Sequence, residues 1–304
     1  MQQHAEGAFA KGLFYVVVTV LFWGILPIAL VFSLSLQDGT TITWFRFLIA
    51  AIIVFAYQLR QGKLSEFKSL SGRDWALLGL AAFSLIVDYI FYIYGLNYID
   101  PSAMQVFSQT TPLFMALGGM LFFKEKISAF QGLCFVALFV GLGLFFNAAI
   151  AGFSFGESRF LTGALLAVTA SIIWAVYAML QKKLVDRLSS TNILLFIYIC
   201  AVFGLLPMSE LTSFGGLDGA AWAIITFCAL NTLIAYGAFA ESLNYWPTTH
   251  ISSVIALTPL ATIAASFMAH QIWPAMVPFP AINPIGWTGV ALTLVAMVLF
   301  NLKR

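Results

Sequence analysis

The chain has 304 residues, of which 62% are hydrophobic and 9% are charged, with a mean hydropathy of +0.97. These values exclude an ordinary soluble domain, in which about 25% of residues are charged. The net charge of +2, without a basic stripe interleaved with aromatic residues, implies no nucleic-acid partner.

Ten segments of the chain are apolar over the length that a membrane span requires. A helix needs about 20 apolar residues to cross the hydrocarbon core, and it satisfies its backbone hydrogen bonds without water. We therefore predict an all-α integral membrane protein with ten transmembrane helices. In chain order the predicted spans are 11–34, 43–60, 74–96, 101–123, 128–146, 161–184, 191–208, 219–244, 248–270 and 286–302.

The basic residues are distributed unequally between the two sides of this arrangement. Of the 14 Lys and Arg residues, all except Arg46 and Arg159 fall at the termini or in the connections that follow even-numbered spans. Cytoplasmic loops of membrane proteins carry an excess of these residues. We therefore predict that the N- and C-termini are both cytoplasmic.

A repeated motif divides the chain into two halves. Residues 96–113 read LNYIDPSAMQVFSQTTPL and residues 243–260 read LNYWPTTHISSVIALTPL, at a constant offset of 147. A duplicated unit in an apolar chain is typical of secondary transporters, whose site lies between the copies. Each copy contains five spans, an odd number, so the second must be inverted. We predict an inverted 5+5 structural repeat, with five-helix units at 1–150 and 151–304.

The first two spans contain two residues with competing interpretations. Trp23 lies near the middle of its span, where an indole N–H needs a partner, and either contacts a ligand or fills the core. Arg46 lies just inside the second span. It either snorkels to the outer interface or holds a substrate carboxylate in its planar fork.

Asp88 in the third span is the most informative charge, because an intramembrane carboxylate costs at least about 2.5 kcal/mol. It shares a helix face with Tyr92. Four interpretations are open: Asp88 binds an ammonium group, carries a proton, forms a structural pair with Arg46, or is an interfacial carboxylate. A pair would keep both groups ionised and make Asp88 a poor proton carrier near neutral pH.

The fourth span carries Gln105, Ser108, Gln109 and Pro112 at spacings that place them on one face. Pro112 frees a carbonyl one turn earlier. Two amides and a hydroxyl exceed what packing between helices requires, so the stripe favours a cavity lining. The related stripe in the ninth span, from Thr249 to Pro259, is smaller and is more typical of close packing.

Spans six and eight supply the remaining candidates. Trp174 occupies a place comparable to that of Trp23, and with Tyr177 and Tyr236 it forms an aromatic cage or part of the core. Asn231 lies in the middle of its span, where it either contributes to the substrate site or packs against a neighbouring helix. Glu241 is near the inner end of span eight. It is either solvated at the interface, paired with a nearby lysine, or involved in coupling transport to an ion.

The segment 271–284 contains four prolines, so we predict that it is not helical and lies along the outer interface. His250 and His270 are interpreted as interfacial residues. Cys134, Cys200 and Cys228 fall in apolar runs without motif spacing, and the sequence predicts neither a metal site, nor a disulfide framework, nor a cofactor.

The stretch 116–144, ALGGMLFFKEKISAFQGLCFVALFVGLGL, and the ten-span layout resemble the EamA-like family of the drug/metabolite transporter (DMT) superfamily. Glu125 stands where the family's Glu usually falls, and Phe22-Trp23-Gly24 and Ile173-Trp174-Ala175 are similar to its repeat openings. The second copy departs from the pattern, because FMAHQIWPAM has no Glu. The resemblance implies transport of amino acids, other small metabolites or drugs across the bacterial inner membrane.

Residues and resemblance together predict a secondary transporter, not an enzyme, that uses alternating access through a central cavity between the repeats. The expected cargo is a small zwitterionic or aromatic metabolite, moved by an exporter or exchanger. An uptake carrier for a nucleoside-like solute or organic cation is the alternative, followed by a channel. Proton coupling, a monomer and a homodimer are all compatible with the sequence, and membrane lipids are the expected surroundings.

Overall fold

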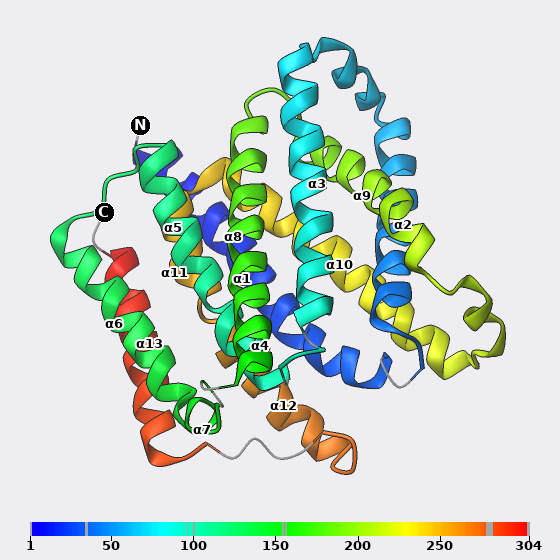
Figure 1. Cartoon of the computed structure of the whole chain (residues 1–304). Helices are drawn as coiled ribbons and strands as arrows, with labels where there is room; N and C mark the ends of the chain where they lie inside the picture. Colours follow the sequence, from blue (N-terminus) through cyan, green and yellow to red (C-terminus); the bar gives the residue numbers. More distant parts are fainter. Residues whose placement is uncertain are drawn as a thin grey trace. The chain divides into compact units, whose positions relative to one another are not determined.

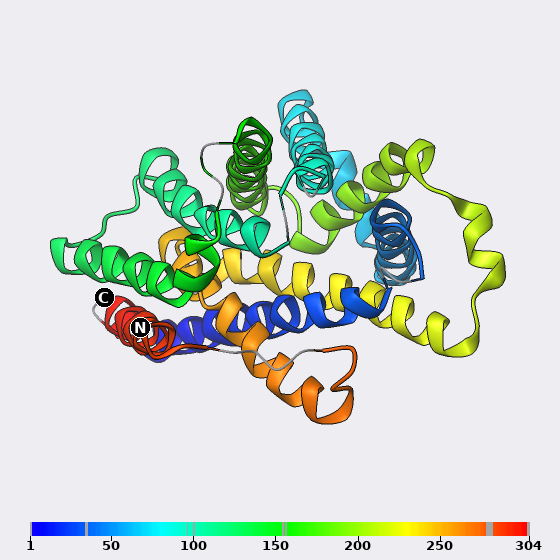
Figure 2. The same ribbon diagram turned by 60° about the horizontal axis from the view of Figure 1, so that its bottom comes forward.

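The computed structural model describes residues 2–33, 36–95, 97–99, 101–153, 155, 157–277 and 282–302, excluding the side chains of 2–7, 31 and 101–103. All regular structure in these ranges is helical (Figures 1 and 2), which confirms the predicted all-α class for them. Lys303 and Arg304, used to predict orientation, lie outside the described residues.

Eight helices of the described chain are long and apolar enough to cross a membrane, so the predicted count of ten is not confirmed. The predicted fourth span is divided into α4 (Pro101–Ser108) and α5 (Thr110–Phe122). The predicted fifth is α6 (Ala129–Phe145), whose 17 residues extend about 26 Å, less than a typical hydrocarbon core.

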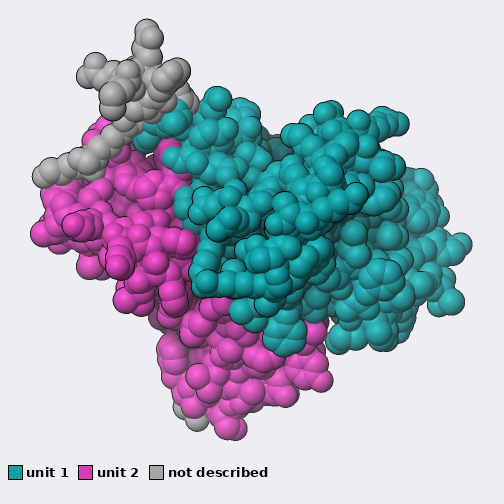
Figure 3. Space-filling model, turned by 90° about the horizontal axis from the view of Figure 1, so that it is seen from above, with its two compact units in different colours: residues 1–86, 180–245, 261–279 teal, residues 87–179, 246–260, 280–304 magenta. Residues whose placement is uncertain are grey.

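The chain forms two compact units, coloured separately in Figure 3. Unit 1 comprises residues 1–86, 180–245 and 261–279, and unit 2 comprises residues 87–179, 246–260 and 280–304. Each unit therefore contains segments from both predicted repeats. Three helices are shared between the units: α3 (Gly72–Gly95), α8 (Ser158–Leu184) and α12 (Thr258–Ile272).

Unit 1 is built around the long helix α10. Its own helices are α1 (Gln2–Ser33), α2 (Gly39–Arg60), α9 (Ser190–Leu205) and α10 (Gly219–Tyr245), with the 3₁₀ segments η1 (Lys63–Ser69), η2 (Leu206–Met208) and η3 (Leu211–Gly216). Helix α1 runs along α10, and α2 packs against both α9 and α10 (Figures 1 and 2). Phe45, Ile225 and Ala229 form a buried apolar cluster where α2 meets α10.

Unit 2 contains two principal helix pairs. Besides α4, α5 and α6, its helices are α7 (Asn147–Ala151), α11 (Thr248–Ile255) and α13 (Pro284–Leu302). Helix α5 packs on α11, and α6 packs on α13, the green and red pair of Figure 1. A Cβ added to Gly141 of α6 would lie 2.8 Å from the carbonyl oxygen of Gly289 in α13. Small residues allow this close approach, as in many membrane helix pairs.

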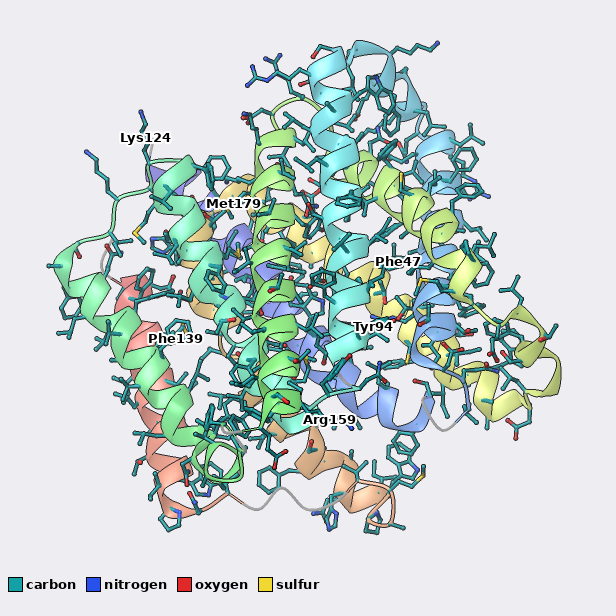
Figure 4. The ribbon with its side chains drawn as sticks, viewed as in Figure 1. Phe47, Tyr94, Lys124, Phe139, Arg159 and Met179 are labelled. Carbon is teal, nitrogen blue, oxygen red and sulfur yellow. The ribbon has the colours of Figure 1, made fainter. Side chains whose placement is uncertain are left out.

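Connections at one end of unit 2 are joined by polar side chains. Arg159, at the start of α8, donates to the Asn97 carbonyl at 2.7 Å, and Asn147 and Asn283 exchange amide hydrogen bonds of 3.0 and 2.8 Å. Figure 4 shows Lys124, which follows α5, at the opposite end of this unit from Arg159. The placement of their loops on opposite sides of the membrane stays a prediction.

Candidate substrate site

Two helices break at related places in the two copies of the repeated motif. Helix α4 ends at Ser108 and α5 begins at Thr110, while α11 ends at Ile255 and α12 begins at Thr258. Ser108 and Ile255 are separated by 147 residues, the offset of the motif. Both breaks fall about one turn before a proline, which removes a backbone donor and clashes with the preceding turn.

Hydroxyl groups satisfy carbonyls at these breaks. The Thr258 hydroxyl donates to the Ile255 carbonyl at 2.6 Å, which is the acceptor that Pro259 cannot reach with an N–H. At the first break, the Thr110 hydroxyl donates to the Phe107 carbonyl at 2.6 Å, one residue before the Ser108 carbonyl that Pro112 cannot reach with an N–H. Each break therefore has at least one carbonyl satisfied by a local hydroxyl.

The predicted polar stripe on α4 lies in partly buried surroundings. The Gln109 amide donates to the Gln105 carbonyl at 3.4 Å, and the Ser108 hydroxyl donates to the Met104 carbonyl at 2.8 Å. Part of the hydrogen-bonding capacity is thus used within the helix, and the amide oxygens and the Gln105 side chain keep additional capacity.

The related stripe on α11 is buried and is paired within unit 2. Ser252 and Ser253 bond to carbonyls one turn earlier, and Asn301 of α13 donates to the Ser253 hydroxyl at 2.9 Å. His250 contacts the Asn301 amide oxygen at 2.9 Å. These contacts are consistent with the packing interpretation of this stripe.

Three candidates come together between α1 and α10 in unit 1. The Trp23 ring meets Tyr236 edge to face with centroids 5.6 Å apart, and it lies 5.6 Å from Phe239. Asn231, 1% exposed, donates to the Phe22 carbonyl at 2.8 Å. The Asn231 amide oxygen has no hydrogen-bond partner among the described residues.

The other aromatic candidates lie in unit 2. Trp174 and Tyr177, one turn apart on α8, make an edge-to-face contact with centroids 5.8 Å apart, and both are buried. Asp88 is half-buried on α3, and Tyr92, one turn later, is 37% exposed. The proposed site residues therefore belong to two units, and their assembly into one cavity stays a prediction.

The two other charged candidates belong to unit 1. Arg46 is 4% exposed, and its Nε donates to the Thr232 hydroxyl at 2.7 Å. This burial argues against snorkelling of Arg46 to an interface, and its substrate-binding role stays a prediction. Glu241 accepts a hydrogen bond from Asn244 at 3.1 Å, while Lys182 donates to the Leu243 carbonyl.

Sequence reasoning missed the capping role of two glutamates, one of which, Glu125, it had noted only for the family resemblance. Glu66 of η1 accepts from the Ser189 N–H at 3.0 Å, the Ser189 hydroxyl at 2.7 Å and Asn192 at 2.9 Å, at the start of α9. Glu125 accepts from the Thr248 N–H at 2.8 Å, the Thr248 hydroxyl at 2.9 Å and the Thr249 N–H at 2.9 Å, at the start of α11. We call these contacts the Glu66 clasp and the Glu125 clasp.

The Glu66 clasp joins two connections that the sequence places on the same side of the membrane, 61–73 and 183–190. Desolvation raises the pKa of Glu66, but hydrogen bonds from Ser189 and Asn192, with the charge of Lys63, outweigh it. The pKa of this carboxyl is therefore held below its usual range. The run Ser189-Ser190-Thr191 before an apolar helix was the available signal, because such residues mark helix N-termini.

Comparisons with known proteins agree with this architecture. The model of the EamA-like transporter family matches residues 10–147 and again residues 161–302. An uncharacterized transporter of Haemophilus influenzae is 35% identical over 95% of this chain and 94% of its own length. The uncharacterized inner membrane transporter YhbE of Escherichia coli K12 is 31% identical over 95% of this chain and 90% of its own length.

More distant proteins extend the likeness. A riboflavin transporter of Brucella anthropi is 24% identical over 83% of this chain and 84% of its own length. A solved crystal structure shares the fold with a TM-score of 0.78 at 16% identity, covering 96% of this chain and 97% of that chain. The chain is a multi-pass membrane transporter of the drug/metabolite type, and it belongs to the EamA-like transporter family.

Proposed function

We propose that this transporter is a secondary carrier that moves a small metabolite across the bacterial inner membrane by alternating access, as an exporter or exchanger. The proposed cargo is an amino acid or a similar zwitterionic or aromatic solute. Family membership and the names of the relatives support transport across the inner membrane. The cargo, the direction and the mechanism are inferences from the residues described above.

The observation that carries this proposal is the pair of helix breaks at one repeat offset. Discontinuous helices at corresponding positions of inverted repeats typically form the substrate site of secondary transporters. The double match of the family model supports units near 1–150 and 151–304. We propose ten spans in an inverted 5+5 arrangement with cytoplasmic termini, in which α4 with α5 and the 17-residue α6 complete the first unit.

We propose that the polar and aromatic candidates line the cargo cavity. Within unit 1, the contact of Trp23 with Tyr236 and the unpaired oxygen of Asn231 support this role. Unit 2 would supply carboxylate, amide and aromatic groups: Asp88, Tyr92, Gln105, Gln109, Trp174 and Tyr177.

The energy source would be a gradient, because the sequence contains no Walker A motif for ATP. Either a proton gradient or the gradient of the cargo itself would drive transport. Asp88 is the proposed proton carrier in the first case. Arg46 and Glu241 are the other charged candidates for coupling.

A second candidate is uptake of a nucleoside-like or flavin-like solute. The observation that favours it is the name of the Brucella anthropi relative, a riboflavin transporter. Stacking of Trp23 or Trp174 on a planar ring would suit such a cargo. A channel is a third, weaker alternative, since inverted duplications also occur in some channels.

Counterflow in proteoliposomes tests the carrier proposal. Vesicles preloaded with unlabelled amino acids should take up labelled amino acid faster than empty vesicles, with saturation. Asp88→Asn and Gln109→Ala should lower the rate or the affinity. Trans-stimulation by riboflavin alone would favour the second candidate. Flux without saturation or trans-stimulation would contradict a carrier.

A further inference from the structure

Arg46 is a buried cation inside a helix of a membrane protein. It lies seven residues after Gly39, about 10 Å along α2, and is 4% exposed. The other basic residues lie at the termini, in connections or near the ends of predicted spans. A buried charge is costly unless it is paired, and an intramembrane arginine therefore calls for a named partner.

The hydrogen bonds around Arg46 fix the orientation of its guanidinium. Its Nε donates to the Thr232 hydroxyl at 2.7 Å, and that hydroxyl donates in turn to the Cys228 carbonyl at 2.9 Å. Thr232 is 1% exposed, so this relay is held inside unit 1. Because Nε is occupied, the two terminal nitrogens remain as a planar fork.

That fork has no carboxylate partner among the described residues of unit 1. A guanidinium carries five N–H donors, and Thr232 supplies a single neutral acceptor. A hydroxyl does not balance a positive charge, whereas a carboxylate matches both the charge and the paired geometry of the fork. One isolated guanidinium balances a monovalent carboxylate better than a phosphate dianion.

We propose that Arg46 binds the carboxylate of the transported solute and that Thr232 is a positioning residue for it. This inference rests on the proposed carrier function and narrows the cargo to solutes that bear a carboxylate, such as amino acids. Asn231, the residue before Thr232 in α10, has a buried amide oxygen without a hydrogen-bond partner among the described residues, and this oxygen offers an acceptor for a ligand donor.

The competing explanation is that Asp88 is a structural counter-charge for Arg46. Asp88 belongs to unit 2 and Arg46 to unit 1. An experiment is therefore needed to distinguish a structural pair from a carboxylate site. A structural pair predicts that Arg46→Gln and Asp88→Asn each destabilise the chain without ligand and that the double variant restores stability. A carboxylate site predicts that Arg46→Gln changes ligand preference and that Asp88→Asn leaves this preference in place.

The test is thermal unfolding of the purified full chain in detergent with each proteinogenic amino acid beside its own carboxamide, since a ligand that binds the folded state raises the melting temperature. At least one amino acid should stabilise the parent more than its amide does. Arg46→Gln should weaken that binding roughly ten- to hundredfold and abolish the preference. Arg46→Lys, which keeps the charge, and Thr232→Val should give intermediate losses.

Arg60→Gln, at the exposed end of the same helix, is the matched control and should behave as the parent does. The proposal is overturned if no amino acid exceeds its amide, if Arg46→Gln keeps the preference, or if only the structural-pair pattern appears. Should Arg46→Gln not fold, Arg46→Lys and Thr232→Val decide the question in the same assay. Carboxylate binding without trans-stimulation would retain Arg46 as a site and contradict the carrier.

Discussion

The Glu66 clasp of unit 1 and the Glu125 clasp of unit 2 solve the same problem differently. Neither α9 nor α11 receives a side-chain hydrogen bond from its own N-cap residue, and each is capped by a glutamate 123 residues earlier. Glu66 uses the single oxygen Oε2 for three donors. Glu125 divides three donors between its two oxygens.

The packing around the two carboxylates also differs. A Cβ on Gly119 of α5 would lie 2.1 Å from the Thr248 hydroxyl and 2.6 Å from Glu125 Oε2, so α5 closes over the Glu125 clasp. Glu66 is half-buried on a 3₁₀ segment in which no residue is fully buried. A carboxylate beside helix N–H groups is stabilising in both places. We expect the covered clasp to contribute more, because it is less screened by water.

The largest effect should come from Gly119→Ala. The added methyl must displace Glu125 or Thr248, and overpacking of this kind costs about 1–3 kcal/mol. Thermal unfolding in detergent measures the loss. Gly143→Ala is the matched control, because a Cβ there meets open space in α6 and should be neutral or stabilising. Equal melting temperatures for the two variants would show that the Glu125 clasp is not tightly covered.

Glu125→Gln should come next, with a loss of about 2 kcal/mol from removal of a charged acceptor that binds three donors. Glutamine keeps the shape of the side chain, so the variant isolates the charge. Thr248→Val, which removes one of those donors, should cost less than Glu125→Gln. The reverse order would assign the stability to the hydroxyl instead of the carboxylate.

Glu66→Gln should cost less than Glu125→Gln, about 1 kcal/mol, the typical value of a helix N-cap. The pKa of Glu66 is lowered in the folded chain, mainly by Ser189 and Asn192 acting against desolvation. The stabilisation is therefore full above the unfolded pKa and is lost as pH falls through the folded pKa. Melting curves of parent and variant should converge on acidification. A difference that persists or grows at low pH would contradict this sign.

The smallest effect should follow Asn147→Ala, which removes one side of the neutral pair with Asn283. That exposed pair has bonds of 3.0 and 2.8 Å and carries no charge, so its loss should cost no more than about 1 kcal/mol. The same unfolding assay applies. If Asn147→Ala lowered the free energy of unfolding more than Glu66→Gln does, the neutral Asn147–Asn283 hydrogen bonds would contribute more to stability than the Glu66 clasp.

Much of the helical layout follows from hydropathy, because apolar runs and charged connections have physical lengths fixed by the membrane. The predicted span 43–60 corresponds to Gly39–Arg60, and 74–96 corresponds to Gly72–Gly95. The division of 101–123 at Gln109 was not predicted, although Pro112 was noted. A hydropathy window averages over a break of one residue, and it does not register local contacts such as the bond from the Thr110 hydroxyl to the Phe107 carbonyl.

For the candidate site, the sequence predicted which residues are involved but not which of them contact each other. Trp23, Asn231 and Tyr236 were each identified from mid-span polarity or aromaticity, yet spacing does not indicate that α1 lies along α10. The clasps were missed for the same reason. Glu66 resembles an ordinary solvated loop charge, and Glu125 was noted only for the family resemblance, because the sequence does not show that distant helix N-termini lie against them.

Labelling of single cysteines from each side of sealed vesicles tests the inverted arrangement most directly. In a background without Cys134, Cys200 and Cys228, we expect Lys68→Cys and Arg187→Cys to react only from the cytoplasmic side. Arg159→Cys should react only from the opposite side. Labelling of Lys68→Cys and Arg187→Cys from different sides would contradict the inverted repeat and the carrier built on it.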